Sequence, residues 1–228
     1  MKDFKIRIEE PKLLSEDIAE SIKKAIIKGK FKPGEKISEG ELAESMGTSR
    51  TPLREAFRKL ENEGFIEIIP RKGAVVTEIF PEEASDLYQI KSVLEGLAAK
   101  LAVSKITEKD VDRLEKINED LKGLIDKNDI EMFYKTHQRF HEVFVKVCGN
   151  HRLIQMVRNL NDHFKRYGIV SLTLPGQFEN ATRQHAEIVE AFRQGSETQV
   201  EAKVRQNVMT GGRVLVEHLS KSRSEGGE

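Results

Sequence analysis

GELAESMGTSRTPLREAFRKLENEGFIEIIPRKGAVV, residues 40–76, contains two helical patterns followed by two β-branched runs. The first helical pattern is capped by Ser38 and ends at Gly47. The second has Pro52 in its first turn and ends at Gly64. The runs FIEIIP and AVVTEIF then flank RKG, as in a β-hairpin with glycine at its tip. With the amphipathic segment LSEDIAESIKKAIIKGKF ahead of it, this order predicts a winged helix-turn-helix of three helices and a hairpin.

The hydrophobic period changes near residues 80–81, after which strand signals disappear. Apolar stripes and Gly- or Pro-containing breaks predict helices over residues 85–103, 107–125, 129–148, 152–170, 178–194 and 196–219. The sequence therefore predicts a mainly α protein. A winged helix-turn-helix domain is expected over residues 1–79, and an all-α antiparallel helical bundle over residues 80–228. The polar end of the chain, residues 220–228, is expected to be disordered.

Composition limits the function classes. The 228 residues carry no net charge, so any binding of nucleic acid must rest on a local basic patch. The single cysteine, Cys148, excludes an internal disulfide and suits a reducing compartment. The N-terminus lacks the apolar region of a signal peptide, and no run of residues reaches membrane-spanning length. We therefore expect a cytoplasmic protein with no membrane partner.

The outward face of the predicted third helix is basic at its start. Arg50, Thr51, Arg54 and Arg58 project away from its apolar face. Arginines at the N-terminal end of a helix that follows a tight turn can reach guanine edges or phosphates. A solvated, salt-bridged helix surface has a similar charge pattern, so the charges alone leave both readings open. The order of helices and hairpin favours DNA.

Residues 40–76 resemble the DNA-binding domain of the GntR family of bacterial transcription regulators, most specifically in SRTPLREAFRKLE. The resemblance, which covers residues 12–79, implies that four residues of the third helix contact operator DNA and that the wing glycine enters the minor groove. The implied residues are Arg50, Thr51, Arg54, Arg58 and Gly73. Lys72, beside that glycine, is expected to lie along the DNA backbone. Gly40 departs from the family pattern, because many relatives carry arginine there.

The stretch YKTHQRFHEVF, residues 134–144, places His137 and His141 four residues apart on one predicted helix face. This spacing allows both to hold one metal ion, and it is close to the H-E-x-x-H pattern of zinc peptidases. A peptidase needs a general base directly after the first histidine, and Gln138 cannot serve as one. A sensor site and two ordinary polar residues remain as alternatives.

The C-terminal part resembles the FCD effector domain of the FadR-type subgroup, over about residues 82–218. The matching segments are DLYQIKSVLEGLAAKLA, FHEVFVKVCGN and HAEIVEAFRQG. The resemblance implies a divalent metal held by one Asp and three His. His141 and His185 fall on ligand positions, whereas His137 stands where relatives have Asp and Asn207 where they have His. Three imidazoles and an amide suit Zn²⁺ or Ni²⁺.

The same resemblance implies a homodimer on double-stranded operator DNA, and a small carboxylate effector bound at the metal. Lys91, Asn207 and His163 are the candidate effector-binding residues. We expect a repressor and not an enzyme. The alternatives are a metal-dependent hydrolase, a sensor of metal alone, or a regulator that binds a fatty acyl group without metal.

Overall fold

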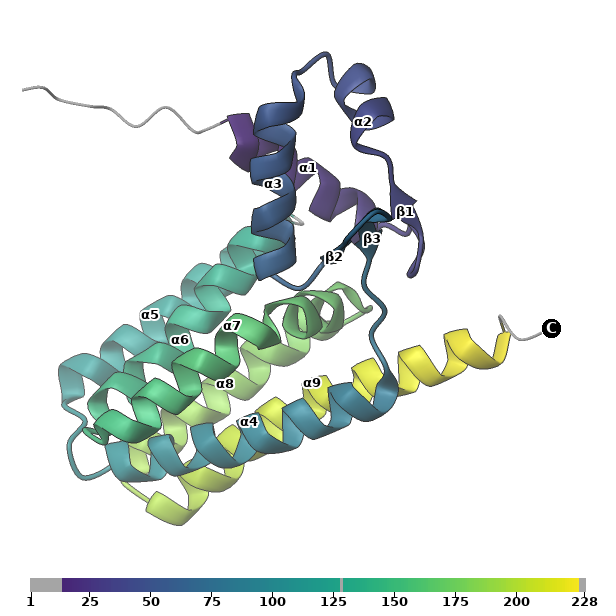
Figure 1. The fold of residues 1–228 in the computed structure, drawn as a ribbon. Coiled ribbons are helices and arrows are strands. Elements are labelled where there is room, and N and C mark those ends of the chain that lie inside the picture. Colours follow the sequence, from purple (N-terminus) through teal and green to yellow (C-terminus); the bar gives the residue numbers. More distant parts are fainter. Residues whose placement is uncertain (1–13, 128, 226–228) are drawn as a thin grey trace, which may run out of the picture. The chain divides into compact units, whose positions relative to one another are not determined.

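The computed structural model describes residues 14–127 and 129–225 and divides the chain into two compact units, Met1–Glu78 and Ile79–Glu228 (Figure 1). This division lies one residue from the boundary predicted from the change of hydrophobic period. Each unit has its own core.

The N-terminal unit consists of three helices and a small sheet. The helices are α1 (Leu14–Ile27), α2 (Glu39–Ser45) and α3 (Arg50–Asn62), and the strands are β1 (Lys36–Ile37), β2 (Ile66–Ile69) and β3 (Gly73–Val76). The antiparallel sheet has the order β1-β3-β2. The predicted winged helix-turn-helix is confirmed. Strand β1 was not predicted, because two residues are too few to show an alternating pattern.

The third helix buries the face that its apolar residues define. Leu53, Phe57 and Leu60 are buried in the core of the unit. The side chain of Ser38 accepts a hydrogen bond from the backbone N–H of Glu41, as expected for the cap of α2. The arginines of α3 are consequently left on the exposed side of the helix.

The C-terminal unit consists of helices. They are α4 (Pro81–Ala102), α5 (Glu108–Ile125), α6 (Ile130–Val147), α7 (His151–Thr173), α8 (Gln177–Gln194) and α9 (Glu197–Glu225). They lie side by side as a bundle (Figure 1), with α5 packed against α6 and α8, and α4 against α9. The main apolar core lies between them and includes Phe140, Phe144 and Ile188.

The end of the chain differs from the prediction. Residues 220–225, expected to be disordered, continue α9 as a helix. Residues 226–228 of the predicted tail lie outside the described residues, as do residues 1–13. Within the described ranges, the helices include none with the length and apolar character needed to cross a membrane.

Glycines allow α4 and α9 to approach each other closely. A Cβ atom at Gly96 of α4 would lie 2.4 Å from Cγ of Arg205, and one at Gly212 of α9 would lie 2.6 Å from Cγ of Tyr88. Both distances are far below van der Waals contact. Larger residues at these positions would therefore push the two helices apart.

Candidate nucleic-acid interface and metal centre

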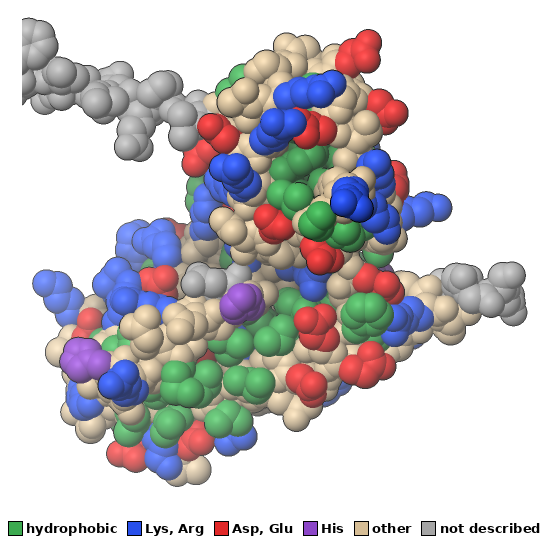
Figure 2. Space-filling model, viewed as in Figure 1, with side chains coloured by type: hydrophobic (Ala, Val, Ile, Leu, Met, Phe, Trp, Pro, Cys, Tyr) green, Lys and Arg blue, Asp and Glu red, His purple; other side chains and the backbone are tan. Residues whose placement is uncertain are grey.

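The basic face of the N-terminal unit is a groove between α3 and the β2–β3 hairpin. The groove has a volume of about 600 Å³. The charged residues in its wall are Lys36, Glu39, Arg54, Arg58, Arg71 and Lys72. Five of these six are cationic, so this face is strongly positive although the whole chain is neutral. Figure 2 shows Lys and Arg side chains exposed on the N-terminal unit.

The predicted contact residues lie on or beside this groove. Arg50, Thr51, Arg54 and Arg58 are all exposed on α3. The Nε of Arg54 donates a hydrogen bond of 2.8 Å to Oε1 of Glu39 on α2. Because this bond uses only Nε, the two terminal nitrogens of the guanidinium remain available as a pair of donors.

The hairpin tip has a strained backbone. Arg71 adopts φ 66°, in the left-handed region that non-glycine residues rarely enter, and Gly73 has φ 91°. The backbone N–H of Lys72 donates to the carbonyl of Ile69 and closes the turn. The exposed tip thus presents Lys72 and a residue without a side chain next to each other.

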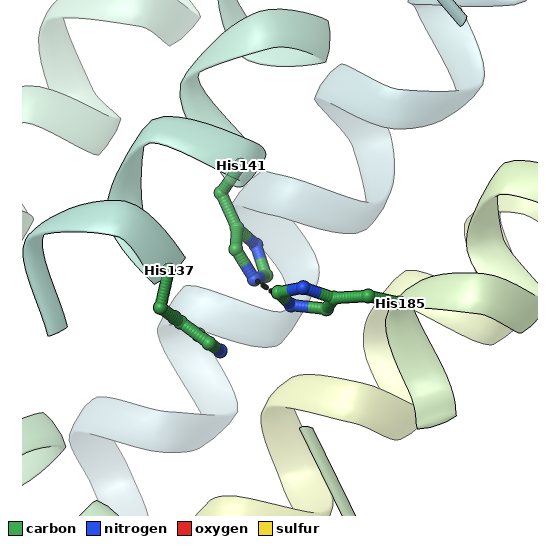
Figure 3. A group of neighbouring side chains, drawn as sticks. All are labelled: His137, His141 and His185. Carbon is green, nitrogen blue, oxygen red and sulfur yellow. Dashed lines mark hydrogen bonds between the residues drawn. The ribbon is translucent and has the colours of Figure 1, made fainter. Parts of the chain in front are cut away.

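In the helical unit, three histidines from two helices converge. His137 and His141 lie one turn apart on α6, and His185 comes from α8 (Figure 3). Nε2 of His141 lies 3.3 Å from Nε2 of His185. One ring nitrogen from each of the three residues lies within 4.8 Å of the others. His185 is fixed in orientation by stacking on Phe140, with ring centroids 3.8 Å apart.

The cluster could hold a divalent metal. Two nitrogens bound tetrahedrally to Zn²⁺ at ordinary bond lengths would be roughly 3.3 Å apart, which matches the separation of the two Nε2 atoms. Nδ1 of His137 is buried without a hydrogen-bond partner; Nδ1 of His185 is also unpartnered, but it points away from Nε2 of the same ring and could not bind the same ion. Unpartnered buried nitrogens are uncommon, so the cluster has bonding capacity that the surrounding side chains do not use.

The protonation of the cluster also suits a metal. Burial lowers the pKa of His137 well below its ordinary value, and the neighbouring His141 lowers it further. Burial, followed by the proximity of His137 and His141, likewise lowers the pKa of His185. Both rings are therefore neutral at physiological pH, which is the form that binds metal ions.

A buried carboxylate, absent from the sequence prediction, contacts the cluster. Glu95 on α4 is fully buried, and its Oε2 lies 2.8 Å from Nδ1 of His141. Its other oxygen accepts a hydrogen bond from Lys91. Burial by itself would raise the pKa of Glu95, but the charges of Lys91 and His141, together with hydrogen bonds from both, lower it to about 2. The sequence signal that could have indicated Glu95 is its pairing with Lys91, a charged pair at positions i and i+4 inside an otherwise apolar helix face.

A cavity of about 50 Å³ adjoins the histidines. Helices α4, α6, α7, α8 and α9 all contribute to its wall. Its polar residues are Tyr88, Lys91, Tyr134, His137, Gln138, His141, Ser171, Gln177, Asn180, Gln184 and Asn207. Tyr88 is buried, which raises its pKa and keeps the hydroxyl protonated.

The candidate effector residues have different positions. Asn207 is buried in the cavity wall, and its Nδ2 donates a 2.9 Å hydrogen bond to Oε1 of Gln184. Lys91 also lines the cavity, but its ammonium is paired with Glu95. His163 differs from the prediction: its side chain is exposed on α7 and is absent from the cavity wall. Helical periodicity turns the next residue, Phe164, into the wall instead.

Comparison with family models identifies both units. Residues 14–76 match the model described as bacterial regulatory proteins, gntR family, and residues 86–209 match the FCD domain. The FCD match alone covers more than half of the chain.

Similar proteins are transcription regulators. The chain is 32% identical over 231 residues to the uncharacterized HTH-type transcriptional regulator YdhC of Bacillus subtilis, covering all of both chains. It is 26% identical to the HTH-type transcriptional repressor RspR of Escherichia coli, with 86% of each chain covered. The structure of E. coli McbR/YncC is similar in fold, with a TM-score of 0.64 at 21% identity, covering 90% of this chain and 97% of that one. The chain therefore belongs to the GntR family of DNA-binding transcriptional regulators, in the group that carries an FCD domain, and is not an enzyme.

Proposed function

We propose that this regulator is a repressor whose helical unit binds a divalent metal, Zn²⁺ or Ni²⁺, together with a small organic acid that modulates operator binding. The observation that carries the proposal is the convergence of three histidines, two of them buried, beside a cavity. Two similar proteins of E. coli, RspR and GlaR, are named as transcriptional repressors.

At the operator, α3 reads bases and the wing holds the backbone. Arg54 and Arg50 serve as base or phosphate contacts, with Thr51 and Arg58 beside them on the same exposed face. Lys72 pairs with phosphate, and Gly73 lets the hairpin tip approach the minor groove closely. The terminal nitrogens of Arg54, left available by its bond to Glu39, are suited to a guanine edge.

At the metal centre, His137, His141 and His185 are the proposed ligands. Asn207 is the proposed fourth group, as a weak ligand or as a hydrogen-bond partner of the effector. A bound metal supplies positive charge that attracts a carboxylate. A cavity of about 50 Å³ would have to open much further for a fatty acyl chain than for a small acid, which favours a small acid over the acyl alternative.

The proposed effector response is a population shift. A ligand larger than the cavity would favour a conformation in which the surrounding helices have moved apart, because it binds only that conformation well. Since helices α4, α6, α7, α8 and α9 all line the cavity, such a change would involve most of the unit.

The proposed assembly is a homodimer that pairs through α4. Ile90, Val93 and Leu97 are 51%, 47% and 39% exposed and lie at helical spacing on one face. An apolar stripe of this kind is costly in water, and a second copy would cover it. Two recognition helices would then address two half-sites of the operator.

Two measurements test the proposal. Metal content is determined on purified protein, and operator binding is followed by gel shift during titration with small organic acids. Arg54→Ala is expected to weaken operator binding but keep the metal, whereas His141→Ala is expected to bind DNA without metal and without an acid response. Equal loss of DNA binding in both variants would contradict separate sites.

A further inference from the structure

Glu95 is the one fully buried carboxylate among the described residues that contacts the histidine cluster, yet it is not itself placed as a metal ligand. It lies on α4, whereas the histidines lie on α6 and α8. Its side chain is 0% exposed. A buried carboxylate is costly unless every oxygen is paired, so its position requires an explanation.

One oxygen of Glu95 determines which nitrogen of His141 carries the proton. Oε2 lies 2.8 Å from Nδ1 of His141, and an ionised carboxylate can only accept a hydrogen bond. Nδ1 must therefore carry the proton. In the neutral ring, Nε2 on the opposite side then has a lone pair, which faces Nε2 of His185 at 3.3 Å and can accept a hydrogen bond or bind a metal ion.

The other oxygen of Glu95 is held by Lys91, one helical turn earlier. The ammonium of Lys91 donates to Oε1 of Glu95 and, at 2.5 Å, to Oδ1 of Asn161 on α7. It also lies 4.7 Å from the ring centroid of Phe164. With these three partners and a side chain only 4% exposed, Lys91 is fixed in place as the counter-ion of Glu95.

We propose that Glu95 is a positioning residue of the metal centre, which holds His141 in the tautomer that presents Nε2 to the ion, and that Lys91 serves Glu95 and not the effector carboxylate. This inference rests on the proposed metal function. A carboxylate behind a metal-bound histidine fixes the ring and makes it a better ligand. Because the pair Lys91–Glu95 is neutral overall, the metal is the group that attracts an anionic effector.

The direct test is the tautomer of His141. ¹⁵N chemical shifts of the histidine rings are recorded on metal-free protein at pH 7.5. Wild-type protein is expected to show protonated Nδ1 and unprotonated Nε2 at His141. In Glu95→Gln, the amide can donate to Nδ1, so the proton is expected to move to Nε2. A wild-type His141 with its proton on Nε2 overturns the inference.

The second readout is metal affinity, measured by competition with a chromophoric chelator. Glu95→Gln is expected to weaken Zn²⁺ binding by about 10–100-fold. Glu142→Gln is the matched control, because Glu142 is the exposed residue next to His141 and is paired with Lys146. Its loss of charge is expected to leave Zn²⁺ affinity within about twofold of the wild type, since surface ion pairs have small effects.

A double variant tests whether the loss of Zn²⁺ affinity comes from misfolding. Glu95→Gln leaves Lys91 buried without its counter-ion, so Lys91→Met/Glu95→Gln removes both charges together. This double variant is expected to fold, by circular dichroism, and to show the same loss of Zn²⁺ affinity. Wild-type affinity in the folded double variant overturns the role of Glu95 alone. Absence of metal uptake by the wild-type protein overturns the proposed metal function as well.

Discussion

Burial keeps the other two histidines of the cluster, His137 and His185, unprotonated near neutral pH. His137 and His185 have pKa values below the ordinary 6.5 in the folded protein, and each regains that value on unfolding. Below pH 6.5 the unfolded chain therefore binds more protons than the folded chain. The stability contributed by the neutral rings is fully present above pH 6.5 and is lost as the pH falls.

The first prediction concerns metal-free protein prepared with chelator. Its free energy of unfolding should decrease from pH 7 to pH 5.5, by at most about 1.4 kcal/mol per pH unit for each buried ring. Urea denaturation at several pH values measures this slope. His137→Gln/His185→Gln should flatten it, and the exposed His151→Gln should not. A slope unchanged in the double variant would show that other groups cause it.

At the level of single residues, only part of the candidate site could be predicted from the sequence. The spacing of His137 and His141 follows from helix geometry, so their proximity could be predicted. Glu95 could not be placed, because its contact with His141 depends on how α4 packs against α6. His163 was predicted to line an effector pocket, but its side chain is exposed and the next residue, Phe164, lines the cavity.

Among the elements, α4 and α9 depend on glycine for their close contact. Gly212→Ala would place a methyl group 2.6 Å from Tyr88, a buried residue in the cavity wall. We predict a loss of about 1–3 kcal/mol in stability, typical of overpacking, and a changed effector response. Gly123→Ala on α5 is the control, because a Cβ there meets nothing within 4 Å. That variant should gain up to about 1 kcal/mol from helix propensity. Thermal unfolding of both variants measures the contrast.

Substitutions in α3 and in the β2–β3 hairpin should change the salt dependence and the sequence preference of DNA binding in different ways. Arg54→Ala should cost about 1–3 kcal/mol of operator affinity and relax sequence preference, as expected for loss of a base contact. Lys72→Ala should weaken binding to all sequences and reduce the slope of log affinity against log salt by about 1. Fluorescence anisotropy with operator and scrambled DNA separates the two. Identical profiles would contradict the division between base and backbone contacts.

Element boundaries were predictable where glycine marks them. Gly176 and Gly195, both at positive φ, stand at the two ends of α8, where the sequence predicted Gly-containing breaks between helices. The end of α9 was not predictable from polarity. Its last turns are polar yet helical, and the sequence SKSRSE has no residue that stops a helix.

At the scale of the whole molecule, a charge placed in the exposed apolar stripe of α4 should change the oligomeric state. Val93→Glu should convert the proposed dimer into monomers, because a charge would be buried in an apolar contact. Operator affinity should fall by more than tenfold, since one chain can occupy only one half-site at a time. Light scattering coupled to size exclusion measures the mass. Lys116→Glu, at an exposed position of α5, should remain dimeric. A monomeric wild type would remove the basis of this prediction.

The division into two units was predictable because the hydrophobic period changes from strand to helix at the boundary. The apolar stripe proposed as the dimer surface was not predictable, because an apolar residue facing solvent and one facing the core look alike in a sequence. Only the exposed fractions of Ile90, Val93 and Leu97 separate them from the buried residues of the same helix.

Each side of helix α4 has a distinct structural or proposed functional role. One side packs on α9 through Gly96, another supplies Tyr88, Lys91 and Glu95 to the site, and the exposed side carries the apolar stripe. Most substitutions in α4 would thus disturb at least one of these properties. Divergence toward new effectors should therefore accumulate in α7 and α8, whose cavity residues can change independently, and α4 should be the slowest helix of the bundle to vary among orthologues.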